Sequence, residues 1–336
     1  MFVATPLLAW VVFFLCASAI GYAGPILVRN ADIVGWRAGL TRSWIGFLLL
    51  ATATSLPELA TGLSAAIVAQ APDIAVGDVF GSCMFNLLMI VLLDVLCREK
   101  PLFASVAQGH ILTAAFGVVA LGFAGAAVLT GRNGQVLSWA NVGITTPLLI
   151  LIYFAAMRSV YRYEAAQTVY WDSVQGYESV RMRTAILRYA WASAVIVVAA
   201  LFLPVAAVEL ARQMGWRQAF VGSLFVAAAT SLPELVVTVG ALRMRALDLA
   251  IANLLGSNLF NILILAVDDI AYRPGPLLPA ASPAHAVTAF MASVMSGIVI
   301  VALLSRPDYR VQGLLGWASL SLLVVYLLGT LSVYLY

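Results

Sequence analysis

Apolar runs of about 20 residues, long enough to cross the hydrocarbon core of a bilayer, recur along this whole chain. Charged residues, Gly and Pro break the 336 residues into ten such runs. A soluble domain has about 25% charged residues, whereas only 10% of this chain is charged and 63% is hydrophobic. The sequence therefore predicts an all-α membrane protein, and no basic tract indicates a nucleic-acid partner.

The ten runs are predicted to be transmembrane helices. They cover residues 3–24, 43–69, 74–96, 105–129, 136–157, 186–210, 218–242, 247–270, 284–304 and 312–334. The longest polar stretch, Arg158 to Arg188, separates five helices from five. We expect a first five-helix repeat in 1–157, a connecting loop in 158–185 and a second five-helix repeat in 186–336.

Loop charges predict the orientation of these helices. If the N-terminus lies outside, all 18 Lys and Arg residues except Arg132, Arg212, Arg217 and Arg273 fall in loops on the inside. Cytoplasmic loops carry such an excess of positive charge. We therefore expect a multi-pass protein of the cell membrane, with both termini outside and the loop 158–185 in the cytoplasm. Because each half has an odd number of helices, the second half is inverted relative to the first.

An internal repeat supports the same division. Residues 53–59, Ala-Thr-Ser-Leu-Pro-Glu-Leu, return unchanged at 229–235. Residues 81–86, Gly-Ser-Cys-Met-Phe-Asn, return as Gly-Ser-Asn-Leu-Phe-Asn at 256–261. Many secondary transporters are built from inverted repeats, with the substrate site near the middle of the membrane where the two repeats meet.

Two glutamates, Glu58 and Glu234, lie well inside predicted helices. A carboxylate at the centre of a membrane helix costs at least about 2.5 kcal/mol on insertion, so it normally faces a polar cavity or a partner. No predicted helix contains an interior Lys or Arg. The partner is therefore a proton, a polar network or a bound cation.

The neighbours of these glutamates favour a cation. Thr54 and Glu58 are four residues apart and share a helix face. Pro57 and Pro233 each lack a backbone donor and clash with the preceding turn, so we expect free carbonyl oxygens at 51–53 and 227–229. Carboxylate, hydroxyl and carbonyl oxygens together form the ligand set that calcium prefers.

Two polar stripes supply an opposite wall. Each stripe has a polar residue at every fourth position, and the stripes comprise Asp78, Ser82 and Asn86, and Asn253, Ser257 and Asn261. A single Ser, Thr or Asn in a membrane helix is explained well enough by packing between helices. A Glu that recurs in the same seven-residue string in both halves indicates a functional site instead.

These two repeated motifs resemble the α-repeats of the cation/calcium exchanger superfamily, which carry a Thr-Ser-Leu-Pro-Glu string and a Gly-Ser-Asn-x-Phe-Asn string. The resemblance implies a ten-helix exchanger with alternating access, in which sodium and calcium compete for sites between helices two, three, seven and eight. Carried over position by position, the implied ligands are the side chains of Thr54, Ser55, Glu58, Ser82, Asn86, Thr230, Ser231, Glu234, Ser257 and Asn261 and the carbonyls of Ala51 and Ala227.

Two positions depart from the family pattern. Cys83 replaces the usual Asn or Ala, and Asp78 replaces a usual Asn. Asp78 lies two helical turns from Asn86 on the same face. We therefore predict that Asp78 supplies a third negative charge to the site, which requires its carboxylate to face Glu58 and Glu234.

Other acidic and histidine side chains have ordinary explanations. Asp94 with Arg98, and Asp269 with Arg273, are spaced for ion pairs on a helix surface. Asp73 and Asp248 begin apolar runs, where a helix N-cap is expected. Asp268 is expected to reach water near the end of its helix. His110 and His285 show no metal-ligand spacing and are expected at the membrane interface.

The sequence therefore predicts a secondary active antiporter that exchanges sodium for calcium. Exchange of calcium or another cation for protons is the main alternative, and a passive cation channel is a weaker one. An enzyme would need an activated nucleophile or an acid–base pair within reach of a substrate, and no histidine or cysteine is placed for that. The expected partners are calcium ions, sodium ions and the lipid bilayer; no cofactor is expected, and the sequence is compatible with a monomer.

Overall fold

The computed structural model describes residues 6–37, 51–97, 101–130, 138–139, 141–166, 180–243, 246–307, 310–311 and 315–336. The start of the second predicted helix, residue Arg98 and the middle of the predicted connecting loop lie outside these ranges. The described chain is almost entirely helical and contains two short antiparallel hairpins, β1–β2 and β3–β4.

The first half contains one broken helix among continuous ones. Its elements are α1 (Pro6–Arg37), α3 (Ala51–Thr54), α4 (Leu56–Ser64), the π-helix η2 (Ala65–Ala69), α5 (Pro72–Leu96), α6 (Leu102–Ser105), α7 (His110–Thr130), β1 (Ser138–Trp139), β2 (Val142–Gly143) and α8 (Thr145–Ala166).

The second half has the same order of long helices and a hairpin, but its π-helix lies before the break in the helix rather than after it. Its elements are α9 (Met182–Met214), α10 (Gln218–Val221), the π-helix η4 (Gly222–Val226), α11 (Ala227–Thr230), α12 (Leu232–Arg243), α13 (Leu247–Ala271), α14 (Leu277–Ala280), α15 (Ala284–Ser305), β3 (Arg310–Val311), β4 (Leu315–Gly316) and α16 (Trp317–Leu335). The helices α5 and α13 each have 25 residues and occupy equivalent places in the two halves.

Within the described ranges, seven helices are long and apolar enough to cross a membrane, or eight if the bent pair Gln218–Thr230 and Leu232–Arg243 counts as one span. A multi-pass, all-helical membrane protein is therefore confirmed. The ten-helix count stays a prediction, because the second span is described only from Ala51 onward and α8 does not meet the same test of length and apolarity.

The helices α1 and α9 are longer than predicted. Helix α1 continues to Arg37, beyond the predicted end at residue 24, and α9 begins at Met182 and ends at Met214. Arg29 and Arg188 therefore lie within these helices, at exposed positions. The apolar run covers only part of each helix, and the helix itself extends beyond it.

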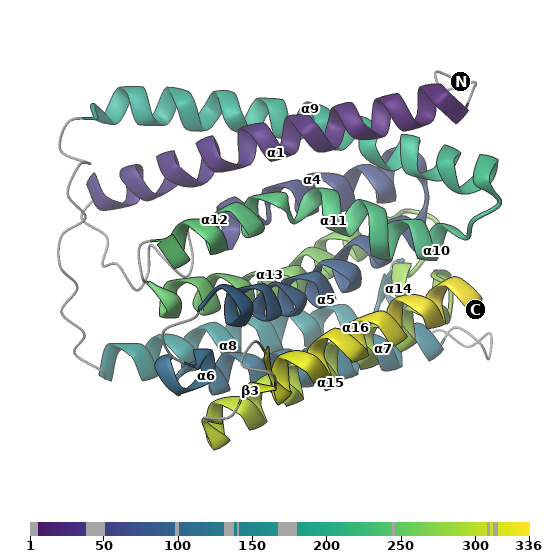
Figure 1. Cartoon of the computed structure of the whole chain (residues 1–336). Helices are drawn as coiled ribbons and strands as arrows, with labels where there is room; N and C mark the ends of the chain where they lie inside the picture. Colours follow the sequence, from purple (N-terminus) through teal and green to yellow (C-terminus); the bar gives the residue numbers. More distant parts are fainter. Residues whose placement is uncertain are drawn as a thin grey trace.

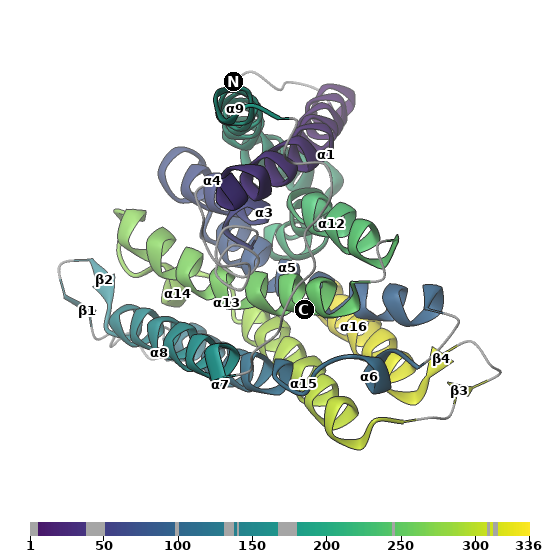
Figure 2. The same ribbon diagram turned by 90° about the vertical axis from the view of Figure 1, so that its left-hand side faces the viewer.

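The helices are arranged in layers (Figure 1). Helices α1 and α9 pack along each other on one side of the molecule and run in opposite directions. Helices α5 and α13 lie in the middle, and α7, α8, α15 and α16 form the opposite side (Figure 2). Burial agrees with this order, since 72% of the most apolar window of α5 and 78% of that of α13 are buried, against 33% for α16.

Glycines allow the central helices to approach closely. A Cβ atom on Gly81 of α5 would lie 2.7 Å from Cα of Ser223 in η4. A Cβ atom on Gly222 would lie 2.9 Å from the carbonyl oxygen of Asp73. Small residues of this kind let the backbones of membrane helices come into contact. They hold the broken helix of the second half against α5 of the first half.

Candidate functional site

Both broken helices bend at the serine of the repeated motif. Ser55, between α3 and α4, has φ −89° and ψ 12°, and Ser231, between α11 and α12, has φ −83° and ψ 13°. Each serine is followed two residues later by a proline, Pro57 or Pro233. The proline cannot donate the bond that would continue the helix, so it accounts for the break.

The prediction of a free carbonyl at Ala227 is wrong in this conformation. That oxygen accepts hydrogen bonds from the backbone N–H of Ser231, at 3.0 Å, and from Oγ1 of Thr230, at 3.2 Å. A proline removes the bond to the carbonyl four residues back, which for Pro233 is Ala229. The role of the Ala227 and Ala51 carbonyls as ligands stays a prediction.

The two glutamates are held by crossed hydrogen bonds between the halves. Ser55 Oγ donates to Oε1 of Glu234 over 3.2 Å, and Ser231 Oγ donates to Oε1 of Glu58 over 3.0 Å. Both glutamates are completely buried, and Oε2 of each has no hydrogen-bond partner. The fold therefore brings both repeated motifs to one buried place, as the sequence predicted.

Hydroxyl groups extend this place along α5 and α13. Thr54 Oγ1 and Ser257 Oγ lie 3.2 Å apart, and the equivalent pair, Thr230 Oγ1 and Ser82 Oγ, lies 3.5 Å apart. Ser231 Oγ, which donates to Glu58, also lies 3.0 Å from Ser82 Oγ. All five side chains are fully buried. The hydroxyls predicted as ligands are thus gathered next to the glutamates.

Asp78 also faces this cluster. Its Oδ1 accepts a hydrogen bond from Thr230 Oγ1 at 2.8 Å, and its Oδ2 is buried without a partner. The negative charges of Asp78, Glu58 and Glu234 repel one another in this buried region. Asp78 therefore contacts the motif of the second half, and its role as a third negative charge stays a prediction. The equivalent position in the second half is the neutral Asn253, so the site is asymmetric.

A relay of amides orients the two motif asparagines. Asn258 Nδ2 donates to the carbonyl oxygen of Cys83 at 3.2 Å, so its Oδ1 is the acceptor for Asn86 Nδ2 at 3.0 Å. Asn261 Nδ2 lies 3.8 Å from Cys83 Sγ. These contacts leave Oδ1 of Asn86 and Oδ1 of Asn261 buried and unpartnered. The sequence analysis did not identify Asn258 as part of the site. Its signal was that it occupies the position equivalent to Cys83, which departs from the family pattern.

The site as a whole presents oxygen atoms that lack donors. Five buried oxygens without a hydrogen-bond partner belong to its side chains, namely Oε2 of Glu58, Oε2 of Glu234, Oδ2 of Asp78, Oδ1 of Asn86 and Oδ1 of Asn261. Unpartnered buried polar atoms are rare and expensive. No Lys or Arg is buried in the described part of the chain, so a cation from solution is the natural partner for this negative charge.

The donor set indicates which kind of cation fits. Among the described residues, no group of three His, Cys, Asp or Glu side chains is compact enough to hold a metal by itself. Hydroxyl and amide oxygens would therefore have to complete the coordination. Oxygen-only sites of this kind suit hard ions such as calcium rather than zinc or copper.

Two further acids are not the surface groups that the sequence predicted. Asp269 is buried and accepts hydrogen bonds from the backbone N–H of Gly143, at 2.9 Å, and of Leu277, at 2.6 Å. Asp94 is buried and accepts from Gly316 N, at 2.9 Å. The predicted surface pair of Asp269 with Arg273 is therefore wrong, because the hairpins fold back to donate to these carboxylates. Arg98 lies outside the described residues.

Asp73 and Asp248 tie helices together rather than capping their own. Asp73 Oδ1 lies 3.1 Å from His285 Nε2, and Asp248 Oδ1 lies 2.9 Å from His110 Nε2. The N-cap position of each helix falls two residues earlier, so the N-cap prediction is wrong. His285 is fully buried within the protein, and its position at the membrane interface stays a prediction.

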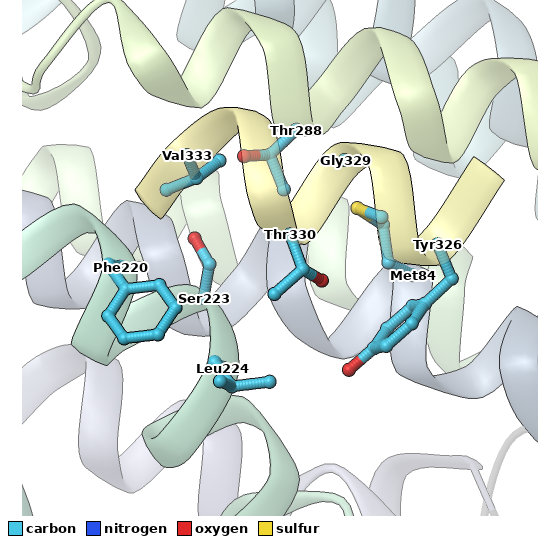
Figure 3. Close-up of a pocket in the computed structure, with 9 residues that line it drawn as sticks. All are labelled: Met84, Phe220, Ser223, Leu224, Thr288, Tyr326, Gly329, Thr330 and Val333. Atoms are coloured by element: carbon cyan, nitrogen blue, oxygen red, sulfur yellow. The ribbon is translucent and has the colours of Figure 1, made fainter. Parts of the chain in front are cut away.

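A small cavity elsewhere does not belong to this site. It lies between α5, the segment α10–η4, α15 and α16, and Figure 3 shows Phe220, Ser223, Thr288 and Tyr326 around it. Its lining includes the hydroxyls of Ser223 and Thr288, which have no hydrogen-bond partner. It contains no carboxylate, so it offers no comparable cation site.

Comparison with known proteins gives a consistent result for the sequence. The model of the family described as sodium/calcium exchanger protein matches residues 8–169 and 184–333. The inner membrane protein YrbG of Escherichia coli (strain K12) is 29% identical over 283 residues, which cover 77% of this chain and 78% of that protein. The sodium/calcium exchanger MaX1 of Methanosarcina acetivorans is 40% identical over 80 residues, 24% of this chain and 23% of that protein.

Solved structures share the fold. The crystal structure of the H⁺/Ca²⁺ exchanger CAX superposes with a TM-score of 0.73 at 13% identity, covering 96% of this chain and 82% of that one. A structure of the sodium-calcium exchanger NCX_Mj soaked with Na⁺ and Sr²⁺ gives a TM-score of 0.59 at 20% identity, covering 96% of this chain and 98% of that one. At these identities the likeness concerns the fold alone.

Proposed function

Because this chain belongs to the sodium/calcium exchanger protein family, we propose that it is a secondary active antiporter that exchanges sodium for calcium by alternating access. The observation that carries the proposal is the pair of completely buried glutamates, Glu58 and Glu234, each held by a serine of the opposite half. Each keeps one carboxylate oxygen without a hydrogen-bond donor. These are the oxygens that a transported cation would bind.

Competition for one site couples the two ions. Glu58 and Glu234 carry two negative charges, which one calcium ion or two sodium ions neutralise. Asp78 adds a third acid, which a third monovalent cation balances. Calcium and sodium then exclude each other, because both need the carboxylates of Glu58 and Glu234. Exchange follows if the helices rearrange only when the site is filled, since an empty site would leave the carboxylates unpaired in the membrane.

The proposed architecture is two inverted five-helix repeats, with boundaries at 1–157, 158–185 and 186–336. The matching order of elements in the two halves and the opposite directions of α1 and α9 support it. In the family mechanism that the resemblance implies, α1 and α9 slide past a fixed core. The charge distribution of the loops supports an orientation with both termini outside and the connecting loop in the cytoplasm.

Exchange of calcium for protons is the second candidate. The likeness in fold to the H⁺/Ca²⁺ exchanger CAX favours it, and three carboxylates crowded in one buried site could also bind protons. Sodium is preferred here because the 80-residue match to the sodium/calcium exchanger MaX1 has 40% identity. Hydroxyls and amides next to the carboxylates, which a proton does not need, also suit a metal ion.

The test uses the purified full-length chain in lipid vesicles. Calcium uptake is measured with an outward sodium gradient at equal pH, and separately with an outward proton gradient in the absence of sodium. Uptake with sodium alone supports the proposal, and uptake with protons alone replaces it by the second candidate. Calcium flux that needs neither counter-ion and does not saturate would indicate a passive channel.

A further inference from the structure

Asp268 is a buried acid that no part of the repeated motif includes. It lies on α13, is completely buried, and neither of its carboxylate oxygens has a hydrogen-bond partner. The charged side chains that act on it are Asp78 and Asp269, both of them acids. The sequence predicted that it reaches water, which is wrong. A carboxylate buried without donor or counter-charge is expensive, so this side chain needs a proton or a cation as its partner.

The opposite helix is shaped to receive this carboxylate. A Cβ atom on Gly62 of α4 would lie 2.8 Å from Cγ of Asp268, closer than side chains pack. The carboxylate therefore rests against the backbone of α4 at the one position where that helix has no side chain. Thr61, the neighbour of Gly62, also has a buried hydroxyl without a hydrogen-bond partner.

Asp268 lies further along the same helix faces that build the central site. Gly62 is four residues, or about 6 Å, beyond Glu58 on α4, and Asp268 is seven residues, or about 10 Å, beyond Asn261 on α13. Spacings of four and seven residues return to the same face of a helix. Both helices lead away from the site in the same direction, because their C-terminal parts meet at the contact of Gly62 with Asp268.

The other half of the molecule lacks this arrangement. At the equivalent positions, Thr238 stands for Gly62 and Leu93 stands for Asp268. The two differences occur together. The half with the small Gly62 has the acid Asp268, and the half with the larger Thr238 has the apolar Leu93. If the halves are inverted, these positions lie on opposite sides of the central site. The acid therefore distinguishes one side from the other.

We propose that Asp268 is a second binding position for a hard metal cation, calcium or sodium, on the route between the central site and the end of the membrane at which α4–η2 and α13 terminate. This inference rests on the proposed antiport function. With both termini outside, that end is the outer face. Asp268 receives a cation arriving from this face and passes it to Glu58, and the opposite route has no such position.

A binding experiment tests the position without relying on transport. Calcium binding is measured by titration calorimetry on the purified full-length protein and on variants with the same detergent and pH. Glu58→Gln, Glu234→Gln and Asp78→Asn together remove the central carboxylates and should leave one weak binding event. Adding Asp268→Asn, which preserves the side-chain volume, should abolish that event. Adding Glu209→Gln instead, at a partly exposed acid that is bonded to Arg212, should leave it unchanged.

Transport from each face gives the second readout. In vesicles, Asp268→Asn should raise the half-saturating calcium concentration about fivefold or more at one face and leave the other face unchanged. Leu93→Asp combined with Thr238→Gly should lower the half-saturating calcium concentration at the opposite face. The proposal for Asp268 alone would be overturned if the central site binds and exchanges calcium normally, Asp268→Asn alters neither face, and the weak event persists when Asp268→Asn is added to the three central substitutions. Wild-type protein that binds neither calcium nor sodium would overturn the proposed function with it.

Discussion

The hydroxyl of Ser231 donates a hydrogen bond to Oε1 of Glu58 over 3.0 Å, across 173 residues of sequence. The equivalent bond, from Ser55 to Glu234, joins the halves in the other direction. Each glutamate is therefore positioned by the opposite repeat, and a rearrangement that separates the repeats would release both carboxylates together. The string Thr-Ser-Leu-Pro-Glu therefore supplies both the donor and the acceptor of these bonds in each half.

Replacing that donor should weaken cation binding without unfolding the protein. Ser231→Ala removes the hydrogen bond that orients Glu58 and the hydroxyl that contacts Ser82. Loss of a partner that orients a metal ligand costs about 10- to 100-fold in affinity. We expect the calcium affinity measured by titration calorimetry to fall within that range. Ser321→Ala is the control, because this exposed serine bonds only to its own helix at Trp317.

An unchanged calcium affinity in Ser231→Ala would mean that the Glu58 carboxylate does not depend on the opposite half. The unfolding temperature of the variant in detergent distinguishes a local effect from a loss of the fold. The reciprocal variant, Ser55→Ala, should behave in the same way toward Glu234.

Neutralising either central glutamate should stop exchange. Glu58→Gln and Glu234→Gln each keep the size of the side chain but remove one of the charges that balance the cation. We expect calcium uptake driven by sodium to fall to the level of empty vesicles in each single variant. Glu209→Gln, at a partly exposed carboxylate bonded to Arg212, should exchange like the wild type. Substantial exchange by either central variant would remove the basis for the proposed site.

The sequence predicted which residues meet at the centre of this site, because each half contributes them from one short motif. Glu58 and its proline lie on one helical turn, and the exact repetition of seven residues marked both copies. The sequence failed where the partner comes from far away. Asp94 and Asp269 each accept from a hairpin more than 120 residues distant, at Gly316 and Gly143, so spacing along their own helices pointed to the wrong partner.

The same reason explains why the burial of Asp268 and the role of Asn258 were not predicted. Asp268 is close to the end of an apolar run, which indicates contact with water, but its burial depends on Gly62 in another helix. Asn258 lies between two recognised positions of the motif, and its role depends on the backbone of Cys83. Neither relationship has a periodicity that could reveal it. The helix ends of α1 and α9 were missed because hydropathy reports lipid contact, not helix length.

Asp78 should set how many sodium ions accompany each calcium ion. Its counterpart in the other half is the neutral Asn253, so Asp78→Asn makes the two halves alike. The variant loses one negative charge from the site and the acceptor for Thr230 Oγ1 becomes an amide oxygen, which still accepts that hydrogen bond. We expect exchange to continue with one sodium ion fewer per calcium ion.

The measurement for Asp78→Asn is the sodium gradient that just balances a fixed calcium gradient, determined in vesicles at several imposed membrane potentials. The slope against potential gives the charge moved in each cycle. A slope equal to that of the wild type would show that Asp78 stays outside the charge balance. Asp248→Asn, an acid at the start of α13 and outside the site, should leave the slope unchanged.

Close contact between the halves should be the part of the fold most sensitive to an added methyl group. A Cβ atom on Gly81 would lie 2.7 Å from Cα of Ser223 and 2.8 Å from Cβ of Ala227, so Gly81→Ala must push η4 and α11 away from α5. Overpacking of a core typically costs about 1–3 kcal/mol, and here it also separates Ser231 from Ser82. We expect a lower unfolding temperature in detergent and weaker calcium binding. Gly122→Ala is the control, because a Cβ atom there meets nothing within 4 Å. It should be neutral or slightly stabilising, because alanine favours the helix. Equal unfolding temperatures for the two variants would show that the halves are not tightly packed at Gly81.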